Sequence, residues 1–108
     1  MCYATSDDGI HWRRPELGLF EYEGSKANNI VMTNEQHEGK DHFGTVLKDS
    51  MDKDPARRYK AIGWSSYDWD GPMSGIYTAV SPDGLHWTVT PEPVFHCHPR
   101  PGTDDLGP

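Results

Sequence analysis

Three aromatic residues that lie close together in the chain are the first candidates for binding chemistry. Trp64, Tyr67 and Trp69 fall within six consecutive positions. The flat faces of aromatic rings suit the C–H faces of pyranose rings, so such a group can form a platform on which a sugar stacks. Aromatic residues of this kind more often pack between protein layers. Of the three, we expect Trp69, which falls in a turn-forming stretch, to be the exposed one.

A second set of reactive side chains is rich in histidine. His96, Cys97 and His98 are adjacent, with His37 and His42 elsewhere in the chain. On a strand, residues two apart point to the same face, so His96 and His98 are spaced for joint metal coordination. No second closely spaced pair accompanies them, and we therefore expect neither a metal ion nor another cofactor.

The element that must position these groups is indicated by a seven-residue motif that occurs twice. Residues 6–12 (SDDGIHW) and residues 81–87 (SPDGLHW) are identical at five positions and are 75 residues apart. Each copy follows a run containing tyrosine and other β-forming residues. This constant offset indicates a repeated structural unit, although two unrelated hairpins that share a common turn are the alternative.

The composition of the motif favours a tight hairpin. In the second copy Pro82 presets φ for a type I turn, Asp83 suits the next position, and Gly84 can take the left-handed conformation that begins the return strand. Serine and aspartate oxygens can accept hydrogen bonds from amides inside the turn. His11 and His86 repeat with the motif, so we expect them to be structural rather than catalytic.

Between the two copies the pattern predicts strands and turns but no helix. Strands are expected near Phe43, from Arg58 to Tyr67, from Gly75 to Val80 and from His86 to Thr90, because apolar and polar residues alternate there and turn formers separate the runs. Four consecutive antiparallel strands form one blade of a β-propeller. We therefore divide the chain into the outer hairpin of a preceding blade (1–15), a connector with a short strand (16–42), one four-stranded blade (43–93) and the start of a following blade (94–108).

Composition restricts the class of partner. The 108 residues carry a formal charge of −7, with no basic cluster beyond two Arg-Arg pairs, which argues against nucleic acids and anionic membranes. Hydrophobic residues make up only 34%, so we expect a thin, aromatic-rich core. No apolar run is long enough to span a bilayer, and no secretory signal is expected. A Cys2–Cys97 disulfide is conceivable, but we expect free thiols.

Four strings of residues, taken in order, resemble a known family. Residues 3–12 (YATSDDGIHW), 28–31 (NNIV), 45–49 (TVLKD) and 58–61 (RYKA) are similar to five-bladed β-propellers of the invertase, arabinanase and levansucrase group, and especially to bacterial glycosyl hydrolase family 32 or 43-like relatives. The similarity extends over nearly the whole chain. It implies an all-β fold with a funnel along the propeller axis, lined by carboxylates from different blades.

The resemblance also implies roles for particular carboxylates. Glycoside cleavage needs at least two carboxyl groups about 5 to 9.5 Å apart. The family's stabilising aspartate follows an inner strand in an Arg-Asp-Pro or Lys-Asp-Pro string. Lys48-Asp49 matches this string, except that Ser50 replaces the proline, and we prefer Asp49 to Asp54. The acid would come from Asp104 or Asp105. A turn aspartate that accepts amide hydrogen bonds is the alternative for Asp49, and solvated carboxylates are the alternative for the acidic pair.

These observations lead to three hypotheses about function. The first is part of a carbohydrate-active propeller whose parent protein hydrolyses or binds glycosides, the 108 residues alone being inactive because the nucleophile's blade is missing. The second is a non-catalytic propeller or sandwich module that binds glycans or proteins. The third is self-association, because a single blade exposes two faces and two unpaired edges.

Overall fold

The computed structural model describes residues 1–33, 37–38, 40–68 and 71–96. The chain forms two compact parts, residues 1–33 and residues 34–108, each with its own hydrogen bonds. Within the described ranges, no helix is long and apolar enough to cross a membrane. The regular β-structure lies in the second part.

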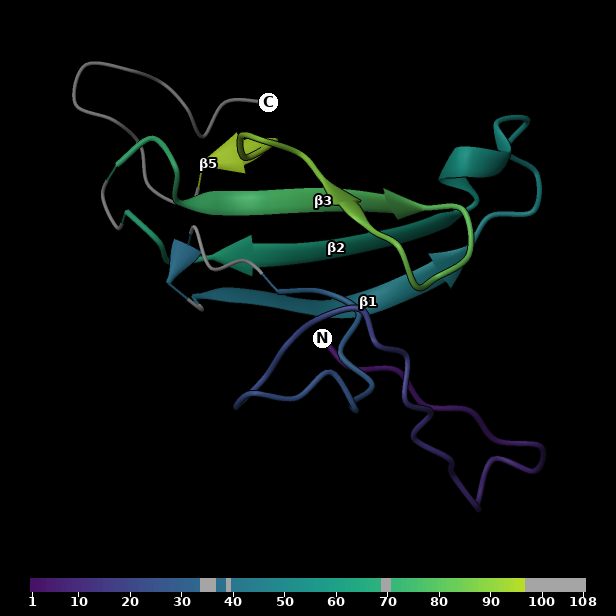
Figure 1. The fold of residues 1–108 in the computed structure, drawn as a ribbon. Helices are drawn as coiled ribbons and strands as arrows, with labels where there is room; N and C mark the ends of the chain where they lie inside the picture. The colour runs from purple at the N-terminus through teal and green to yellow at the C-terminus, as the bar shows by residue number, and fades with distance from the viewer. Residues whose placement is uncertain (34–36, 39, 69–70, 97–108) are drawn as a thin grey trace. The chain divides into compact units, whose positions relative to one another are not determined.

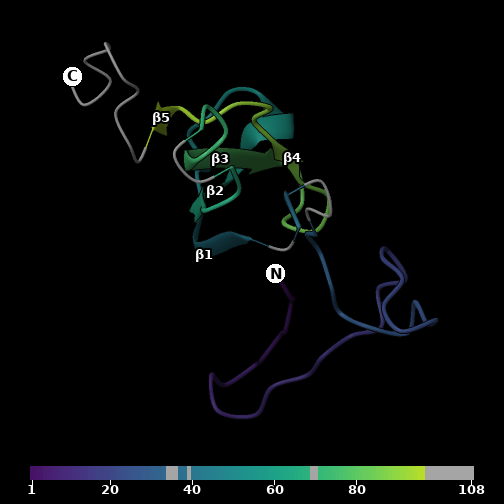
Figure 2. The same cartoon turned by 90° about the vertical axis from the view of Figure 1, so that its left-hand side faces the viewer.

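The second part is built on one antiparallel sheet (Figure 1). Its strands are β1 (Asp41–Lys48), β2 (Tyr59–Ser65), β3 (Gly75–Ser81), β4 (Thr88–Val89) and β5 (Phe95–His96). The first four are hydrogen-bonded in sequence order, β1-β2-β3-β4, and Figure 2 shows β1, β2 and β3 one above the next. A single 3-10 turn, η2 (Pro55–Arg57), lies in the connection between β1 and β2.

The sheet has two faces of different chemistry because side chains alternate along each strand. On β3, the residues Gly75, Tyr77, Ala79 and Ser81 are buried, whereas the residues between them are only partly buried. Ala61, Gly63 and Ser65 of β2 are buried on the same face, as the sequence pattern of that strand predicts. We call this the small-residue face. The opposite face carries Ile62 and Trp64, and we call it the outer face.

Gly63 is required at its position by its neighbour on β1. Phe43 lies directly opposite Gly63, and a Cβ on Gly63 would come within 2.7 Å of the Phe43 ring. The aromatic ring therefore covers a position that has no side chain of its own. One residue further along β1, Gly44 is an extra residue that shifts the register between Phe43 and Thr45, which is a β-bulge.

The strand next to β3 is interrupted by a pair of prolines. β4 pairs with Ala79 and Val80, and β5 pairs with Gly75 and Ile76 further along β3. Between them, Pro91 and Pro93 have no N–H to donate to the sheet. Pairing resumes at once where a donor returns, because the Val94 N–H bonds to the Ile76 carbonyl at 2.7 Å.

The first part holds its chain together by isolated bridges. Thr5 and Arg13 exchange two backbone hydrogen bonds, of 2.9 and 2.7 Å, which close the first hairpin around the motif at 6–12. Cys2 pairs with Ile30, so the predicted short strand at 30–32 takes the form of a single bridge. The Cys2 thiol is free and exposed.

The prediction of an all-β chain with an antiparallel sheet is confirmed. The observed strands start and end within two residues of the expected positions, except that β4 is shorter. Phe95 and His96, which the sequence division placed after the sheet, pair with β3 instead.

Candidate functional site

Asp49, the candidate catalytic residue, lies in the turn that follows β1. Its amide donates to the Arg58 carbonyl at 2.6 Å, which continues the pairing of β1 with the start of β2 by one residue. Its carboxylate accepts a hydrogen bond from the Met51 amide at 3.1 Å. The side chain is half-buried. Asp49 therefore accepts an amide hydrogen bond within its own turn, as turn aspartates commonly do, and its carboxylate has one further partner.

That partner is Lys60, which joins Asp49 to a second carboxylate. The Lys60 ammonium nitrogen donates to Asp49 Oδ2 at 2.7 Å and to Asp52 Oδ2 at 2.8 Å. The Arg57 guanidinium lies 3.8 Å from the same Asp52 oxygen. Two acidic and two basic side chains thus form one cluster, which we call the Lys60 cluster.

The turn that carries the cluster is shaped by its aspartates. Asp49, Asp52 and Asp54 each accept a hydrogen bond from the amide two residues further on. This is the local bond that short acidic side chains favour in turns. Asp54 also caps η2, where Pro55 fits the first helical position. The sequence therefore places Asp49 and Asp52 above the start of β2, within reach of Lys60.

Electrostatics keep both carboxylates of the cluster ionised. The hydrogen bond from Lys60 is the main cause that lowers the pKa of Asp49, with a smaller contribution from the Met51 amide. The hydrogen bond from Lys60 likewise lowers the pKa of Asp52, helped by the Asp54 amide. In return the bonds to Asp49 and then Asp52 raise the pKa of Lys60. Each charge thus favours the charged form of its partner.

The Lys60 cluster holds two ionised carboxylates, but neither can act as a general acid. Both Oδ2 atoms contact the same nitrogen, at 2.7 and 2.8 Å, so they are at most about 5.5 Å apart. The carboxyl groups of retaining glycosidases are likewise close, about 5 to 5.5 Å apart. Such a pair, however, needs one carboxyl group with a raised pKa to protonate the leaving group. Both pKa values are lowered here, so neither Asp49 nor Asp52 is equipped to be the acid.

The predicted aromatic platform is divided between the two faces of the sheet. Trp64 lies on the outer face, 43% exposed, with its ring stacked on His42 at 4.5 Å between centroids. Tyr67 stacks on His37 at 4.9 Å, and His37 also contacts Tyr77, whose side chain is buried on the small-residue face. The structure therefore does not bring Trp64 and Tyr67 together. Of the two platform residues that the structure describes, Trp64 is the one with an exposed ring and an aromatic neighbour on the outer face.

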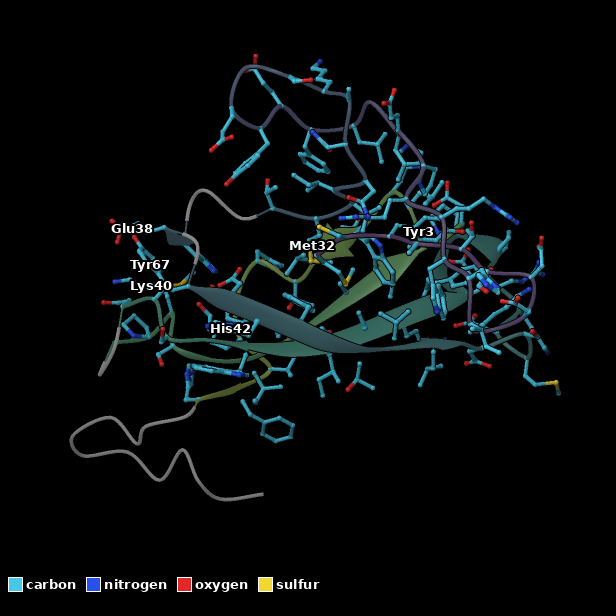
Figure 3. The ribbon with its side chains drawn as sticks, turned by 90° about the horizontal axis from the view of Figure 1, so that it is seen from below. Tyr3, Met32, Glu38, Lys40, His42 and Tyr67 are labelled. Atoms are coloured by element: carbon cyan, nitrogen blue, oxygen red, sulfur yellow. The ribbon has the colours of Figure 1, made fainter. Side chains whose placement is uncertain are left out.

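The polar contacts around His37 were not predicted from the sequence. This buried side chain bonds through Nδ1 to Asp41 Oδ1 at 2.8 Å and lies between the rings of Tyr67 and Tyr77. Figure 3 shows Tyr67 beside Glu38 and Lys40 at one end of the sheet, with His42 further along β1. Burial is the main cause that raises the pKa of Tyr77, followed by the charge of Asp41. The four-residue spacing of His37 and Asp41 is the signal that could have revealed the pair.

The two copies of the motif form almost the same network. Asp8 and Asp83 each accept hydrogen bonds from two amides of their own turn and bond through Oδ2 to the following histidine at 2.7 Å. His11 and His86 are therefore used within the turn, which agrees with a structural role.

Several predicted residues lie outside the part of the chain that the structure describes. These are Trp69, Asp104 and Asp105, and also Cys97 and His98 of the histidine-rich set. Among the described residues, no three His, Cys, Asp or Glu side chains are grouped so that they could hold a metal ion.

Comparisons with known proteins add no relative to this description. No protein-family model, curated protein or solved structure matches the chain. The functional argument therefore depends on the chain's own residues and their geometry.

Proposed function

We propose that this chain is part of a carbohydrate-active propeller protein, in which its sheet forms one blade. The observation that carries the proposal is the placement of the two motif copies. The Ser-x-Asp-Gly turns have matching hydrogen bonds, and between them lie three of the four consecutive antiparallel strands, with β4 directly after the second turn. A turn that recurs once for every four consecutive antiparallel strands is what successive propeller blades produce. The resemblance of four sequence strings to glycoside-active propellers supports the carbohydrate substrate.

Within such a protein, Asp49 would stabilise the positive charge that develops on the sugar ring. A permanently ionised carboxylate at the end of an inner strand suits that role. The Lys60 hydrogen bond is the first cause that lowers the pKa of Asp49, and it further favours the ionised form that an ordinary aspartate already has at neutral pH. The acid and the nucleophile would have to come from other blades, and Asp104 and Asp105 are the nearest candidates for the acid in the sequence.

The test is a comparison of two neutralised carboxylates in the full-length protein that contains this sequence. Asp49→Asn should lower kcat on aryl glycosides and oligosaccharides by about a hundredfold or more, as expected when a group that stabilises transition-state charge is lost. Asp52→Asn is the matched control, because Asp52 shares Lys60 and should cost less than about tenfold if it only holds the turn. Equal effects of the two substitutions, or none, would remove Asp49 from the mechanism.

A second function, glycan binding without hydrolysis, is favoured by one observation. Lys60 already occupies the Asp49 carboxylate at 2.7 Å, while Trp64 presents a stacked, partly exposed ring on the outer face. The same experiment distinguishes this alternative. The binding alternative holds if the full-length protein cleaves no glycoside but binds oligosaccharides, and if Asp49→Asn leaves that binding unchanged.

A further inference from the structure

The outer face of the sheet is organised in three rows of side chains that run across the strands. Residues directly opposite each other in antiparallel strands share a face, so the pairing defines each row. The aromatic row is His42, Trp64, Ile76 and Phe95. The middle row is Thr45, Ile62 and Thr78. The third row is Leu47, Lys60, Val80 and Thr88.

The aromatic row presents the largest apolar side chains of this face to solvent. Phe95 is 62% exposed, and Trp64 is 43% exposed with His42 stacked against it, while Ile76 lies between the two in the row. Soluble chains rarely leave several large apolar side chains adjacent on one surface unless that surface binds something. This end of the face is therefore a candidate contact surface.

The opposite end of the same face is hollowed. A cavity of about 370 Å³ opens there, and its walls include Thr45, Leu47, Ile62, Thr78 and Val80. Most of the wall is apolar. The hollow exists because the threonine and valine side chains are too short to fill the space above the sheet. Lys60 and Arg57 also line this hollow, but Asp49 and Asp52 already match their two positive charges. An apolar occupant thus fits the hollow better than an anion.

We infer that the occupant is the aromatic row of a second copy of this chain. Trp64 and Lys60 lie four residues apart on β2, about 13 Å at the usual strand rise, with Ile62 midway between them. A two-fold axis that lies between the two faces, runs parallel to the rows and passes over Ile62 turns the faces toward each other. It therefore places the aromatic row of each copy over the hollow of the other. The same patch then serves both partners, as in an isologous dimer.

The area of the face is sufficient for a weak dimer. Four strands about 4.8 Å apart and seven residues long measure roughly 19 by 23 Å, so two copies cover about 900 Å² before side-chain relief is added. Specific interfaces begin near 1,000 Å² in total, and small ones are weak and transient. Dissociation in the micromolar range or weaker is the expected strength.

Sedimentation velocity of the 108-residue chain over a range of concentrations tests the dimer. Leu47→Ser removes a side chain that is 53% exposed in the third row and should weaken dimerisation at least tenfold. Val46→Ser is the matched control, since Val46 is its neighbour on β1, is 48% exposed, and shares a face with Ala61 on the other side of the sheet. It should change the dissociation constant by less than about threefold. Circular dichroism checks that both variants keep the sheet.

Three outcomes would overturn this inference. The chain could stay monomeric up to millimolar concentration, both variants could weaken association equally, or Leu47→Ser could leave it unchanged. Equal weakening would indicate pairing along the open edge of β1 instead of across the outer face. In a complete propeller the next blade would cover the outer face, so the dimer is tested on the 108-residue chain and the glycoside assays on the full-length protein. Either result can therefore fail without the other.

Discussion

The two copies of the Ser-x-Asp-Gly-x-His-Trp motif have the same local structure in different surroundings. In both, the serine hydroxyl oxygen accepts a hydrogen bond from the glycine amide at 2.8 Å. The glycines take similar positive φ angles, 76° at Gly9 and 80° at Gly84. Seven residues thus determine the conformation of the turn. The second motif position is Asp7 in one copy and Pro82 in the other, and the conformation is the same with either residue.

The copies differ in what their side chains contact. Trp87 is half-buried, and its indole nitrogen donates to the Gly84 carbonyl at 3.0 Å. Trp12 is 62% exposed. The second turn lies between β3 and β4, with the ring of Tyr59 close to Gly84, whereas no atom lies within 4 Å of the Cβ position of Gly9. The second copy is therefore packed onto the sheet whose strands it joins.

This difference separates two sources of order in a hairpin. Hydrogen bonds within the turn are set by local sequence and survive without packing. The contribution of the same turn to the stability of the fold depends on the strands that it joins. The same substitution should therefore have unequal effects in the two copies, and the following predictions test that inequality.

The largest expected effect is that of removing the turn aspartate. Asp83→Ala leaves the amides of Leu85 and His86 without their acceptor and should lower the free energy of unfolding of the sheet by about 1 to 2 kcal/mol, the usual cost of losing a side-chain cap. Asp8→Ala breaks the same bonds in the first copy and should leave the unfolding midpoint of the sheet unchanged. Urea unfolding followed by circular dichroism measures both. Equal shifts would show that the two turns belong to one cooperative unit.

A smaller effect is expected for the motif tryptophans. Trp87→Phe removes the hydrogen bond to the Gly84 carbonyl and should destabilise the sheet by about 1 kcal/mol. Trp12→Phe should stay within about 0.5 kcal/mol of the wild type, as is usual for exposed positions. Thermal unfolding of the two variants under one buffer condition provides the comparison. A larger loss at Trp12 than at Trp87 would mean that the first copy is the better packed one.

Most of the sheet could be predicted from the sequence because its signals are local. The alternation in residues 59–65 and 75–81 and the two Asp-Gly turns define strand and turn positions without any distant contact. The pairing of Phe95 with Ile76 was not predicted, since two prolines normally end a strand and here they only interrupt it. The bulge at Gly44 was missed for a similar reason, because glycine within a strand has several uses.

The candidate site was less predictable because it depends on contacts between turns and strands. Asp49 was selected from a short string, but nothing in that string identifies Lys60, eleven residues later, as its partner. The available signal for this partner was the alternation of β2, which puts Lys60 on the same face as Ile62 and Trp64. Trp64 and Tyr67 lie apart because Tyr67 follows the end of β2, where the alternation that places Trp64 no longer applies.

The smallest expected effect is the loss of turn stability at low pH, when the motif aspartates become protonated. The hydrogen bond from the His11 ring is the main cause that lowers the pKa of Asp8, ahead of the His11 and Ile10 amides. For Asp83, desolvation is the largest influence and raises the pKa. Hydrogen bonds lower the pKa of Asp83, first from the His86 amide and then from the His86 ring. Together with the bonds from the Leu85 amide and Ser81 they outweigh desolvation, so the pKa of Asp83 is also lowered. Folded-state pKa values below the ordinary aspartate value of about 3.9 mean that both carboxylates stabilise their turns above that pH, and that this stabilisation is lost as pH falls toward the folded values.

Replacing the histidines tests whether the two copies use these bonds differently. His11→Ala removes the main cause at Asp8, whereas His86→Ala leaves the larger amide contribution at Asp83 in place. The pKa of Asp8 should therefore rise more than that of Asp83, and the first turn should loosen at a higher pH than the second. Carboxyl-carbon NMR titration of each variant from neutral pH downward measures both values. A greater rise at Asp83 would show that the histidine ring matters more where the turn is packed, and that the difference between the copies is not one of packing alone.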